Sequence, residues 1–561
     1  MRNRKIIIGS RGSDLALWQA HFVLSELKKL KIDAELKIIK TQGDKIQNLS
    51  FDKLEGKGFF TKEIEEALLK KEIDLAVHSH KDLPTEFPKG LIIAAVSDRE
   101  DPSELLLINK NAVDEKQKFS LKQNALVGTS SARRKSQLLA WRSDLKIEDL
   151  RGNVPTRIQK LRDKKYDAIL IANAGVSRLE IDLSEFHCEK LDVKEFIAAP
   201  AQGVLALQIR ESDKELFEKL QPLNHKEVAE TIGVERKILN LFDGGCQLPL
   251  GVYCEKEEND RFTPNPSPSE RGTHIYKVWV AKAENTNSFP KYFYFESRKT
   301  EGLAEKIVSK IKTPLSLGRG AGGEVGAGGG LSVFISRDEK RNDFFKRCLQ
   351  ANGFKVFCQS LIEIKQIPIR KYKKCDWVFF SSKNAVKHFF EQKPDVEGVK
   401  FGAVGKTTAE EIRKFGKRAE FIGSSDDTRM TGKKFSALLG NKTVLFPQAK
   451  ESMKTIQFQL PRKENVVNLI VYETIKTVES SKLKVESLDV LVFTSPSNVD
   501  AFFEKYNRTN VPSLWEGFGV DSKVVAMGDA TANALKKHGV KANKQPASFD
   551  DLGLVQAVMS L

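Results

Sequence analysis

Residues 5–40 read KIIIGSRGSDLALWQAHFVLSELKKLKIDAELKIIK, and this stretch decides the fold class. The apolar run at 5–9 is typical of a short buried strand, and residues 14–30 repeat apolar side chains at the spacing of one helix face. Residues 34–40 then return to a strand-like pattern. A strand, a helix and a second strand in succession predict an α/β fold with a largely parallel sheet.

The same alternation continues through the first half of the chain and favours an arrangement in two lobes. A helix is expected at 59–71. Further strands are expected at 74–77, 125–128, 168–172 and 205–209.

Two segments of biased composition interrupt this alternation of strands and helices. RFTPNPSPSERG at 261–272 is rich in proline, and TPLSLGRGAGGEVGAGGG at 313–330 is rich in glycine. Neither has enough apolar side chains to order itself by burial. Strand-like runs flank the first segment, which is therefore interpreted as an insertion in a hairpin loop, and the second is interpreted as an interdomain linker.

The second half of the chain contains a repeat. FFSSKNAVKHFF at 379–390 matches VFTSPSNVDAFF at 492–503, and AVGKTTAEEIRKFG at 403–416 matches AMGDATANALKKHG at 526–539. Each copy has a strand that ends in Ser or Thr, a helix, and a second strand that runs into a glycine turn. The period is far too long for a solenoid, so we predict two copies of one α/β unit.

Length and composition limit the number of domains and the kinds of partner that we expect. The chain has 561 residues, 30% of them charged, and 92 Lys and Arg against 75 Asp and Glu give a net charge of +17. This length exceeds what one hydrophobic core accommodates, so several domains are expected. The positive excess is typical of a protein with an anionic partner, although a lysine-rich solvated surface gives the same number.

The sequence also indicates where the protein is located and which cysteine-based features it lacks. No run approaches the roughly 18 apolar residues that span a bilayer, and the apolar block near the start is too short for a signal peptide. We therefore expect a cytoplasmic protein that does not enter a membrane. Six cysteines without CxxC spacing make a disulfide framework or a structural zinc site unexpected.

Arginines recur where strands give way to helices in the first half. Helix N-termini offer unpaired N–H groups, and arginine adds a planar pair of donors, so together they suit anions. A solvated arginine at one such junction is common, whereas a series of them favours a shared polyanion cleft. Carboxylates fit better than phosphates because no phosphate-binding glycine loop occurs. The residues in question are Arg11, Ser13, Thr129, Ser131, Arg133, Arg134, Arg151, Arg157 and Arg178.

Two further motifs carry candidate chemistry. In VHSHKDLP at 77–84, Asp82 follows a strand end, where an ionised carboxylate can stabilise a cation or move a proton, or can simply pair with Lys81. The neighbouring histidines have no third ligand at a sensible spacing, so no metal is expected. In DGGCQLP at 243–249, Cys246 is either a buried structural cysteine or a residue presented for covalent chemistry.

Five motifs together resemble hydroxymethylbilane synthase, also called porphobilinogen deaminase. This resemblance implies two periplasmic-binding-protein-like lobes and a small α+β domain that carries Cys246. It also implies one dipyrromethane cofactor per chain, joined to Cys246 by a thioether, on which four porphobilinogens are assembled. The motifs are RGSDLALWQA at 11–20, HSHKDLP at 78–84, GTSSARR at 128–134, LRGNVPTR at 150–157 and GGCQ at 244–247.

The resemblance also implies roles for single residues. Asp82 would stabilise the azafulvene cation left when ammonia departs, and Lys57 and Phe60 would belong to a loop that covers the site. The cofactor would contact Lys81, Asp82, Thr129, Ser131, Arg133 and Arg134. The substrate carboxylates would contact Arg11, Ser13, Arg151, Arg157 and Arg178.

Three positions depart from the family pattern. His80 stands where Met or Arg is frequent, Ala201 stands where a glycine is usual, and Gln208 replaces a glutamate. None of them coincides with Asp82 or Cys246.

The second half resembles uroporphyrinogen-III synthase from about residue 332 to the end. That family has two α/β domains with substrate between them and needs no metal, and the resemblance implies that Tyr472 helps a hydroxyl group to leave. For the other candidates helix capping is an equally good interpretation. The residues implied to line the cleft are Ser382, Thr408, Ser495, Ser497 and Thr531.

These inferences give one division of the chain into domains. Lobe 1 is 1–100 with a return segment at 198–220, lobe 2 is 101–197, and the small α+β domain is 221–312. After a linker at 313–331, the first synthase domain is 332–365 with 476–561, and the second is 366–475.

The sequence thus predicts a bifunctional enzyme of haem biosynthesis. Its first half would polymerise porphobilinogen to hydroxymethylbilane with release of ammonia, and its second half would cyclise that product to uroporphyrinogen III with inversion of ring D. The alternatives are a deaminase with a degenerate synthase half, or a polycarboxylate-binding protein without catalysis. A nucleic-acid partner is disfavoured because no such motif occurs, and we expect a monomer.

Overall fold

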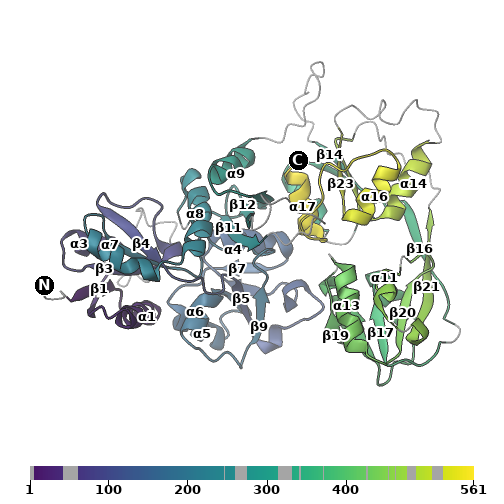
Figure 1. The fold of residues 1–561 in the computed structure, drawn as a ribbon, viewed down its shortest axis with the longest axis horizontal. Coiled ribbons are helices and arrows are strands. Elements are labelled where there is room, and N and C mark those ends of the chain that lie inside the picture. The colour runs from purple at the N-terminus through teal and green to yellow at the C-terminus, as the bar shows by residue number, and fades with distance from the viewer. Residues whose placement is uncertain are drawn as a thin grey trace, which may run out of the picture. The chain divides into compact units, whose positions relative to one another are not determined.

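The computed structural model groups the chain into two compact units, and each is described by itself (Figure 1). Met1–Ser316 makes up most of the first unit and Gly353–Leu554 most of the second. The structure describes residues 5–41, 61–245, 247–258, 274–313, 331–339, 343–369, 372–424, 427–452, 454–461, 463–476, 488–507 and 522–561.

The first sheet of the first unit has the order β2-β1-β3-β10-β4. Strands β1, β2 and β3 are mutually parallel, whereas β10 runs antiparallel to both of its neighbours. The expectation of a largely parallel sheet holds for four of these five strands. The exception is β10, because it re-enters this sheet from the opposite end after the chain has built the second lobe. The elements are β1 (Ile6–Ser10), α1 (Asp14–Lys29), β2 (Ala34–Ile38), α3 (Lys62–Leu69), β3 (Leu75–Ser79), β4 (Leu91–Val96), β10 (Leu205–Arg210) and α7 (Lys214–Leu220).

The second sheet has the order β7-β6-β8-β5-β9, and it too has one antiparallel strand inside it, β5. Side chains of β5 alternate between two cores, since Leu106 and Ile108 join one apolar cluster and Leu105 and Leu107 join the other. The elements are β5 (Glu104–Ile108), β6 (Leu126–Gly128), α4 (Ala132–Trp141), β7 (Lys146–Glu148), α5 (Val154–Arg162), β8 (Ala168–Ala172), α6 (Asn173–Arg178) and β9 (His187–Leu191).

A third, antiparallel sheet of three strands completes this unit, with the order β11-β12-β13. Helices α8 and α9 accompany it, so this part is α+β. The proline-rich insertion at 261–272 falls between β11 and β12, outside the described residues, as does the glycine-rich segment from 314 onward. The elements are α8 (Lys226–Leu241), β11 (Leu250–Glu258), β12 (His274–Lys282), β13 (Lys291–Ser297) and α9 (Leu303–Lys312).

The second unit contains two sheets. A fully parallel one has the order β15-β14-β22-β23, and a larger one has the order β16-β21-β20-β17-β18-β19, in which β16 alone is antiparallel. The strands are β14 (Ser332–Ile335), β15 (Lys355–Cys358), β16 (Ile362–Gln366), β17 (Trp377–Phe380), β18 (Lys400–Ala403), β19 (Ala419–Ile422), β20 (Val444–Ala449), β21 (Val466–Lys476), β22 (Val490–Phe493) and β23 (Lys523–Ala526).

The sequence repeat corresponds to a structural repeat. In one copy β17 and β18 are parallel neighbours, with Phe380 opposite Ala403, and in the other β22 and β23 are parallel neighbours, with Phe493 opposite Ala526. A helix follows each of these strands. The helices of the later chain are α10 (Phe344–Ala351), α11 (Lys383–Phe390), α12 (Lys406–Lys414), α13 (Thr428–Leu439), α14 (Pro496–Asn507), α16 (Asp529–Lys537) and α17 (Asp551–Met559).

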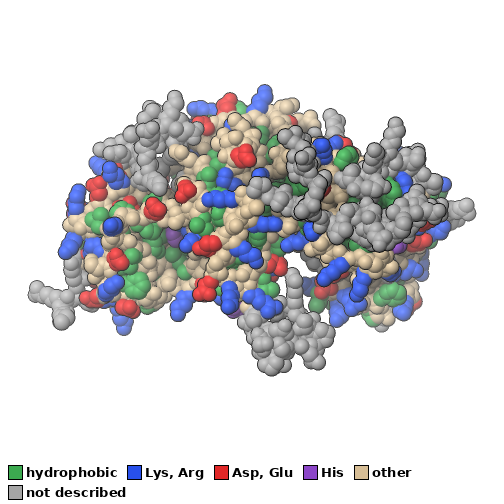
Figure 2. Space-filling view, turned by 90° about the horizontal axis from the view of Figure 1, so that it is seen from above, with side chains coloured by type: hydrophobic (Ala, Val, Ile, Leu, Met, Phe, Trp, Pro, Cys, Tyr) green, Lys and Arg blue, Asp and Glu red, His purple; other side chains and the backbone are tan. Residues whose placement is uncertain are grey.

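On the one face that Figure 2 shows, the charged side chains of the described residues are spread out rather than gathered. On the face drawn in Figure 2, Lys and Arg side chains alternate with Asp and Glu over the described residues. The net charge of +17 therefore forms no single basic stripe on this face.

Candidate functional site

Asp82 stands on a one-turn 3₁₀ helix, η2 (His80–Asp82), directly after β3. Its side chain is exposed, whereas the neighbouring Lys81 is largely enclosed and donates to Oε1 of Gln202 at 3.1 Å. Burial lowers the pKa of Lys81, and the Asp82 carboxylate partly offsets this effect. The strand end thus presents an accessible carboxylate beside a partly desolvated ammonium group.

Glu104 is the buried counter-ion of this region, and the sequence analysis did not identify it. It is the first residue of β5 and is 0% exposed. Its two oxygens accept from Arg133 at 2.5 Å and from Arg134 at 2.7 Å. Burial alone would raise the pKa of Glu104, but the charges of Arg134 and Arg133 outweigh burial and hold it well below its usual range.

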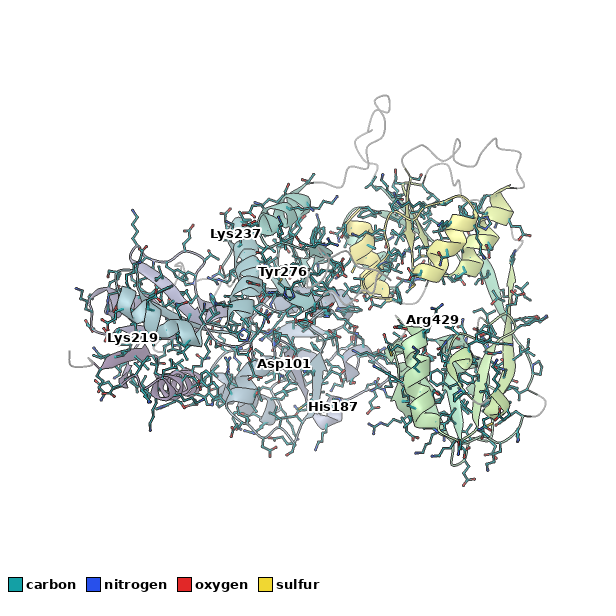
Figure 3. All side chains as sticks on the ribbon, in the orientation of Figure 1. Asp101, His187, Lys219, Lys237, Tyr276 and Arg429 are labelled. Carbon is teal, nitrogen blue, oxygen red and sulfur yellow. The ribbon has the colours of Figure 1, made fainter. Side chains whose placement is uncertain are left out.

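Gln202 connects the two lobes at this point. Its amide nitrogen donates to Glu104 at 3.2 Å and to the carbonyl of Pro102 at 2.7 Å, while its amide oxygen accepts from Lys81. Asp101, labelled in Figure 3, marks the same stretch of chain just before β5. Neither Gln202 nor Glu104 sits in a local pattern that would reveal this contact, because they are far apart in sequence.

Arg133 and Arg134 make more hydrogen bonds within the protein than their motif predicts. Besides Glu104, Arg133 donates to the carbonyl of Ile197 at 2.9 Å and Arg134 to the carbonyl of Leu170 at 3.0 Å. Nε of Arg134 is buried and has no hydrogen-bond partner among the described residues. Each guanidinium has five N–H donors, so both keep donors beyond those used here.

The hydroxyl groups of the GTSSARR motif shape the start of α4. Ser131 is the N-cap and accepts from the backbone N–H of Arg134 at 3.5 Å, and Thr129 accepts from the N–H of Ser131 at 3.3 Å. These bonds satisfy backbone donors at the helix end. They also place the two hydroxyl groups beside the arginine pair.

Arg157 joins the same cluster from α5. Its Nε donates to the carbonyl of Gly152 at 2.7 Å. Burial, followed by the charge of Arg134, lowers the pKa of Arg157 to about 10. Arg151 has its guanidinium 4.0 Å from the carboxylate of Asp149.

Arg178 makes a contact between lobes. It donates to the carbonyl of Gly203 at 2.6 Å, and its guanidinium lies 5.7 Å from the ring centroid of Trp18 on α1. Burial lowers its pKa. Arg11 and Ser13 lie between β1 and α1, and Ser13 precedes α1 without capping it through its side chain. Lys57, Phe60 and Cys246 lie outside the described residues.

The structure shows the conformation or the surroundings of the three positions that depart from the family pattern. Ala201 adopts φ of +60°, a left-handed conformation that glycine accepts more easily. Gln208 is buried and bridges His78, at 3.0 Å, to Glu65, at 3.1 Å. Burial lowers the pKa of His78 to about 4 and, together with the charge of Arg236, that of His80 to about 3.

In the second unit the structure brings two predicted residues together. The hydroxyl groups of Tyr472 and Ser382 lie 3.3 Å apart. Tyr472 is 8% exposed, and burial raises its pKa. The ring of His388 lies 5.6 Å from that of Tyr472.

The remaining hydroxyl candidates act as local structural groups. Ser382 caps α11 by accepting from the N–H of Ala385, and Ser495 accepts from the N–H of Asn498. Thr531 donates to the carbonyl of Met527 at 3.2 Å and is buried, as is Thr408. Ser497 is half-buried near the start of α14.

A hollow of 490 Å³ lies elsewhere on this unit, at α13. It includes none of the predicted residues. Figure 3 labels Arg429 in the first turn of α13, beside this hollow. The lining residues are Arg429, Lys433, Thr455, Phe458 and Gln459.

Two absences hold for the described ranges. No helix there is long and apolar enough to cross a bilayer. In the same ranges, no three His, Cys, Asp or Glu side chains are grouped so that they could hold a metal ion.

These features define a class before any comparison is made. The first unit is a two-lobed α/β module with an attached α+β domain and a cluster of buried cations at the junction of its lobes. The second is an α/β module built from a duplicated strand–helix pair. The description is that of a two-module α/β protein with a cation-rich candidate site in its first module.

Comparison with known proteins makes the class specific. Residues 6–218 match the family model described as porphobilinogen deaminase, dipyromethane cofactor binding domain, and residues 343–556 match that of uroporphyrinogen-III synthase HemD. The porphobilinogen deaminase of Chloroherpeton thalassium is 40% identical over 309 residues, which are 54% of this chain and 91% of that protein. That of Bacillus cereus is 45% identical over 259 residues, 46% of this chain and 82% of that protein.

The chain therefore belongs to the porphobilinogen deaminase family and also carries a uroporphyrinogen-III synthase domain. The resemblance to both families is thus confirmed. Among solved structures, the uroporphyrinogen-III synthetase of Helicobacter pylori is similar over 41% of this chain and 98% of its own, with 18% identity and a TM-score of 0.31.

Proposed function

We propose that the first unit assembles hydroxymethylbilane from four porphobilinogens with release of ammonia, and that the second closes this product to uroporphyrinogen III with inversion of ring D. The observation that carries the first part is the cluster of Lys81, Arg133, Arg134 and Arg157 beside an exposed Asp82. Both family assignments support the pair of reactions.

The charge balance of the cluster suits a substrate rich in carboxylates. Its four cations face one buried acid, Glu104, and one exposed acid, Asp82. Burial and neighbouring positive charge lower the pKa of Lys81 and of Arg157, so bringing a carboxylate close would relieve repulsion. Porphobilinogen carries an acetate and a propionate, and each added unit supplies two more carboxylates.

The residues present also fit a dipyrromethane. The buried Nε of Arg134, without a partner among the described residues, is a donor that a carboxylate of such a group would satisfy. When bound, the dipyrromethane supplies the primer on which the four porphobilinogens are assembled. In this proposal Cys246 holds it through a thioether, one per chain. The residues that would contact it are Lys81, Asp82, Thr129, Ser131, Arg133 and Arg134.

Asp82 is the proposed catalytic group of the first reaction. Its carboxylate is exposed at the strand end, where it can stand beside the positive charge that develops on a porphobilinogen as ammonia leaves. Lys81 at its side is held by Gln202 and keeps the turn in place. The proposed substrate contacts are Arg11, Ser13, Lys57, Phe60, Arg151, Arg157 and Arg178.

Tyr472 is the proposed catalytic group of the second reaction. Its hydroxyl is a neutral donor, because burial raises its pKa, and Ser382 lies within hydrogen-bond distance. A neutral O–H can donate a proton or a hydrogen bond to a departing hydroxyl group. The proposed lining residues are Ser382, Thr408, Ser495, Ser497 and Thr531.

The domain boundaries given above, a monomeric state and a cytoplasmic location belong to the same proposal. The first synthase domain would hold the all-parallel sheet, and the second would hold the six-stranded one. Strands β16 and β21, which pair with each other, would be the two segments at which the chain passes between these domains.

Intact mass separates this proposal from a binding protein without catalysis. We expect the purified chain to be heavier than its sequence by one dipyrromethane, and Cys246→Ser to lack the added mass while remaining folded. The wild-type protein should release ammonia from porphobilinogen, and the variant should not. An unmodified wild-type chain that binds porphobilinogen without releasing ammonia would favour the binding protein instead.

A further inference from the structure

The turn that carries Asp82 has little internal support. Helix η2 is a single 3₁₀ turn, closed by the N–H of Leu83 donating to the carbonyl of His80 at 3.2 Å. Hydrogen bonds of 3₁₀ turns have poor geometry, so such a turn keeps its shape only with outside partners. One partner comes from the residue just before β10, since the N–H of His80 donates to the carbonyl of Val204 at 2.9 Å.

A second partner is Arg236, on helix α8 of the α+β domain. Its guanidinium donates to the carbonyl of Leu83 at 2.8 Å, to that of Pro84, and at 3.5 Å to that of His80. The rigid planar fork of arginine can hold several carbonyl groups in one arrangement, which a single-point donor cannot do. The main chain on both sides of Asp82 is therefore tied to one side chain from another domain.

Helix α8 is itself held in place by the residue next to Arg236. Glu235 is 0% exposed and accepts two bonds from Arg99, at 2.7 and 3.2 Å. It also accepts from the N–H groups of Ala201 and Cys254, at 2.7 and 2.8 Å. Lys237, labelled in Figure 3, shows where this stretch of α8 lies.

These contacts hold α8 in place, so that Arg236 can fix the position of the turn at 80–84. Arg99 and Ala201 belong to the two segments by which the chain passes between the lobes, and Cys254 belongs to the third sheet. A helix bonded to all three cannot move without disturbing them. The carbonyl groups that Arg236 holds are thus placed relative to both lobes at once.

We propose that Arg236 is a positioning residue for the deaminase reaction: it fixes the main chain of His80–Pro84 and so aims the Asp82 carboxylate. This inference rests on the proposed catalytic role of Asp82. Arg236 need not touch substrate, and its effect passes entirely through Asp82. Misplacement of a catalytic group by about 1 Å can cost on the order of 100-fold in rate.

The test compares Arg236→Met with Arg236→Lys in the full-length, cofactor-bearing chain. We expect Arg236→Met to lower kcat by about 30-fold while KM for porphobilinogen changes by less than about twofold, because the turn shifts but the binding cations remain. Arg236→Lys should recover part of the loss, since an ammonium group donates to carbonyls without the fork. Intact mass checks that each variant keeps its cofactor.

Arg142 provides a matched control in lobe 2. It also donates to three loop carbonyls, those of Lys118, Leu121 and Lys122. Arg142 is buried and Arg236 is half-buried. Arg142→Met should lose comparable stability in urea unfolding while kcat stays within about twofold of wild type. An equal loss of kcat in both variants would mean that Arg236 has a general structural role, which would overturn the proposal.

A double-mutant cycle with Asp82→Asn decides whether the effect passes through Asp82. We expect Arg236→Met to change kcat by less than about twofold when Asp82 is already Asn, because there is no carboxylate left to aim. A further 30-fold loss in that background, or a folded Arg236→Met with kcat within about threefold of wild type, would contradict the proposal. If Arg236→Met does not fold, Arg236→Lys takes its place in the same cycle. An unchanged rate for Asp82→Asn alone would reject the proposed function of Asp82 itself.

Discussion

The two units place their candidate groups at similar strand ends but use different strand directions to do so. In each lobe of the first unit an antiparallel strand lies inside the sheet, so Glu104, the first residue of β5, lies opposite Ala172, the last residue of β8. Leu205, at the start of β10, likewise lies opposite Ser79, at the end of β3. Among the strands described in the second unit, β16 alone runs antiparallel, and it lies at a sheet edge.

This difference in strand direction determines which side chains meet at each candidate site. An antiparallel strand delivers side chains from its beginning to the edge where parallel strands end, which is how Glu104 meets Arg133 and Arg134. With parallel strands alone, that edge is filled by the turns into helices, where Ser and Thr are favoured as caps. The first site is therefore built from buried charges. In the second, Ser382 caps α11 and its hydroxyl lies 3.3 Å from that of Tyr472, which stands within β21.

The largest effect should follow from removing the buried acid. Glu104→Gln leaves Arg133 and Arg134 without their counter-ion, and breaking a buried pair in this way costs about 3–5 kcal/mol. We expect a corresponding loss of stability in urea unfolding and loss of deaminase activity. Glu185→Gln, in an exposed pair with Arg162, is the control and should change stability by less than about 0.5 kcal/mol. A loss below about 1 kcal/mol for Glu104→Gln would show that the buried charges are not mutually dependent.

Asp82→Asn should separate catalysis from stability. Its side chain is exposed, so we expect a normal unfolding midpoint and retention of the cofactor mass. The rate should fall more than about 100-fold, or about 2.7 kcal/mol in barrier, since an amide cannot stabilise developing positive charge as a carboxylate does. Steady-state ammonia release measures this, and a change of less than about threefold would reject the role.

Acid should destabilise the first unit through its buried histidines. The folded-state pKa of His78 is about 4 and that of His80 about 3, against an ordinary 6.5, so the unfolded chain takes up protons first. Their contribution to stability is present above pH 6.5 and is lost as pH falls toward 4, at roughly 1.4 kcal/mol per pH unit for each histidine.

Urea unfolding at pH 7 and pH 5 measures this slope. His78→Gln should narrow the difference in stability between the two pH values by about 2 kcal/mol. His21→Gln, on the exposed side of α1, should leave the difference unchanged. An undiminished difference in the His78 variant would mean that this imidazole is not held neutral by burial.

Substitutions at the candidate site of Tyr472 and Ser382 should give the smallest changes in rate and stability. Tyr472→Phe should slow formation of the type III isomer by about tenfold, because one general-acid contact is lost. Ser382→Ala should cost about 1 kcal/mol of stability through the lost helix cap, with a rate change below about threefold. Deaminase activity in the same chain is the internal control. A larger effect for Ser382→Ala than for Tyr472→Phe would reverse the proposed roles.

Local sequence patterns were sufficient for many of the elements and for the caps at the starts of α4 and α11. The strands expected at 168–172 and 205–209 are β8 and β10, and the caps at Ser131 and Ser382 follow from residue type. Both family resemblances were also available from short motifs. These features depend on neighbours in sequence.

Features that depend on tertiary pairing could not be predicted. Nothing in ELLLI indicates that β5 runs antiparallel, so Glu104 gave no signal beyond an acid leading an apolar run. Gln202 and Arg236 act through partners about 100 or more residues away. Arg178 follows a strand as expected, but its contacts with Gly203 and Trp18 require the two lobes to be assembled.

One measurement tests the central claim most directly. Porphobilinogen is supplied as the sole substrate to the purified full-length chain, and the uroporphyrinogen isomer is identified after oxidation to the porphyrin. The account predicts the type III isomer from wild type and an increasing share of type I from Tyr472→Phe, because hydroxymethylbilane released unconverted closes spontaneously to type I. Type I alone from wild type would contradict the synthase half, and no porphyrin at all would contradict the deaminase half.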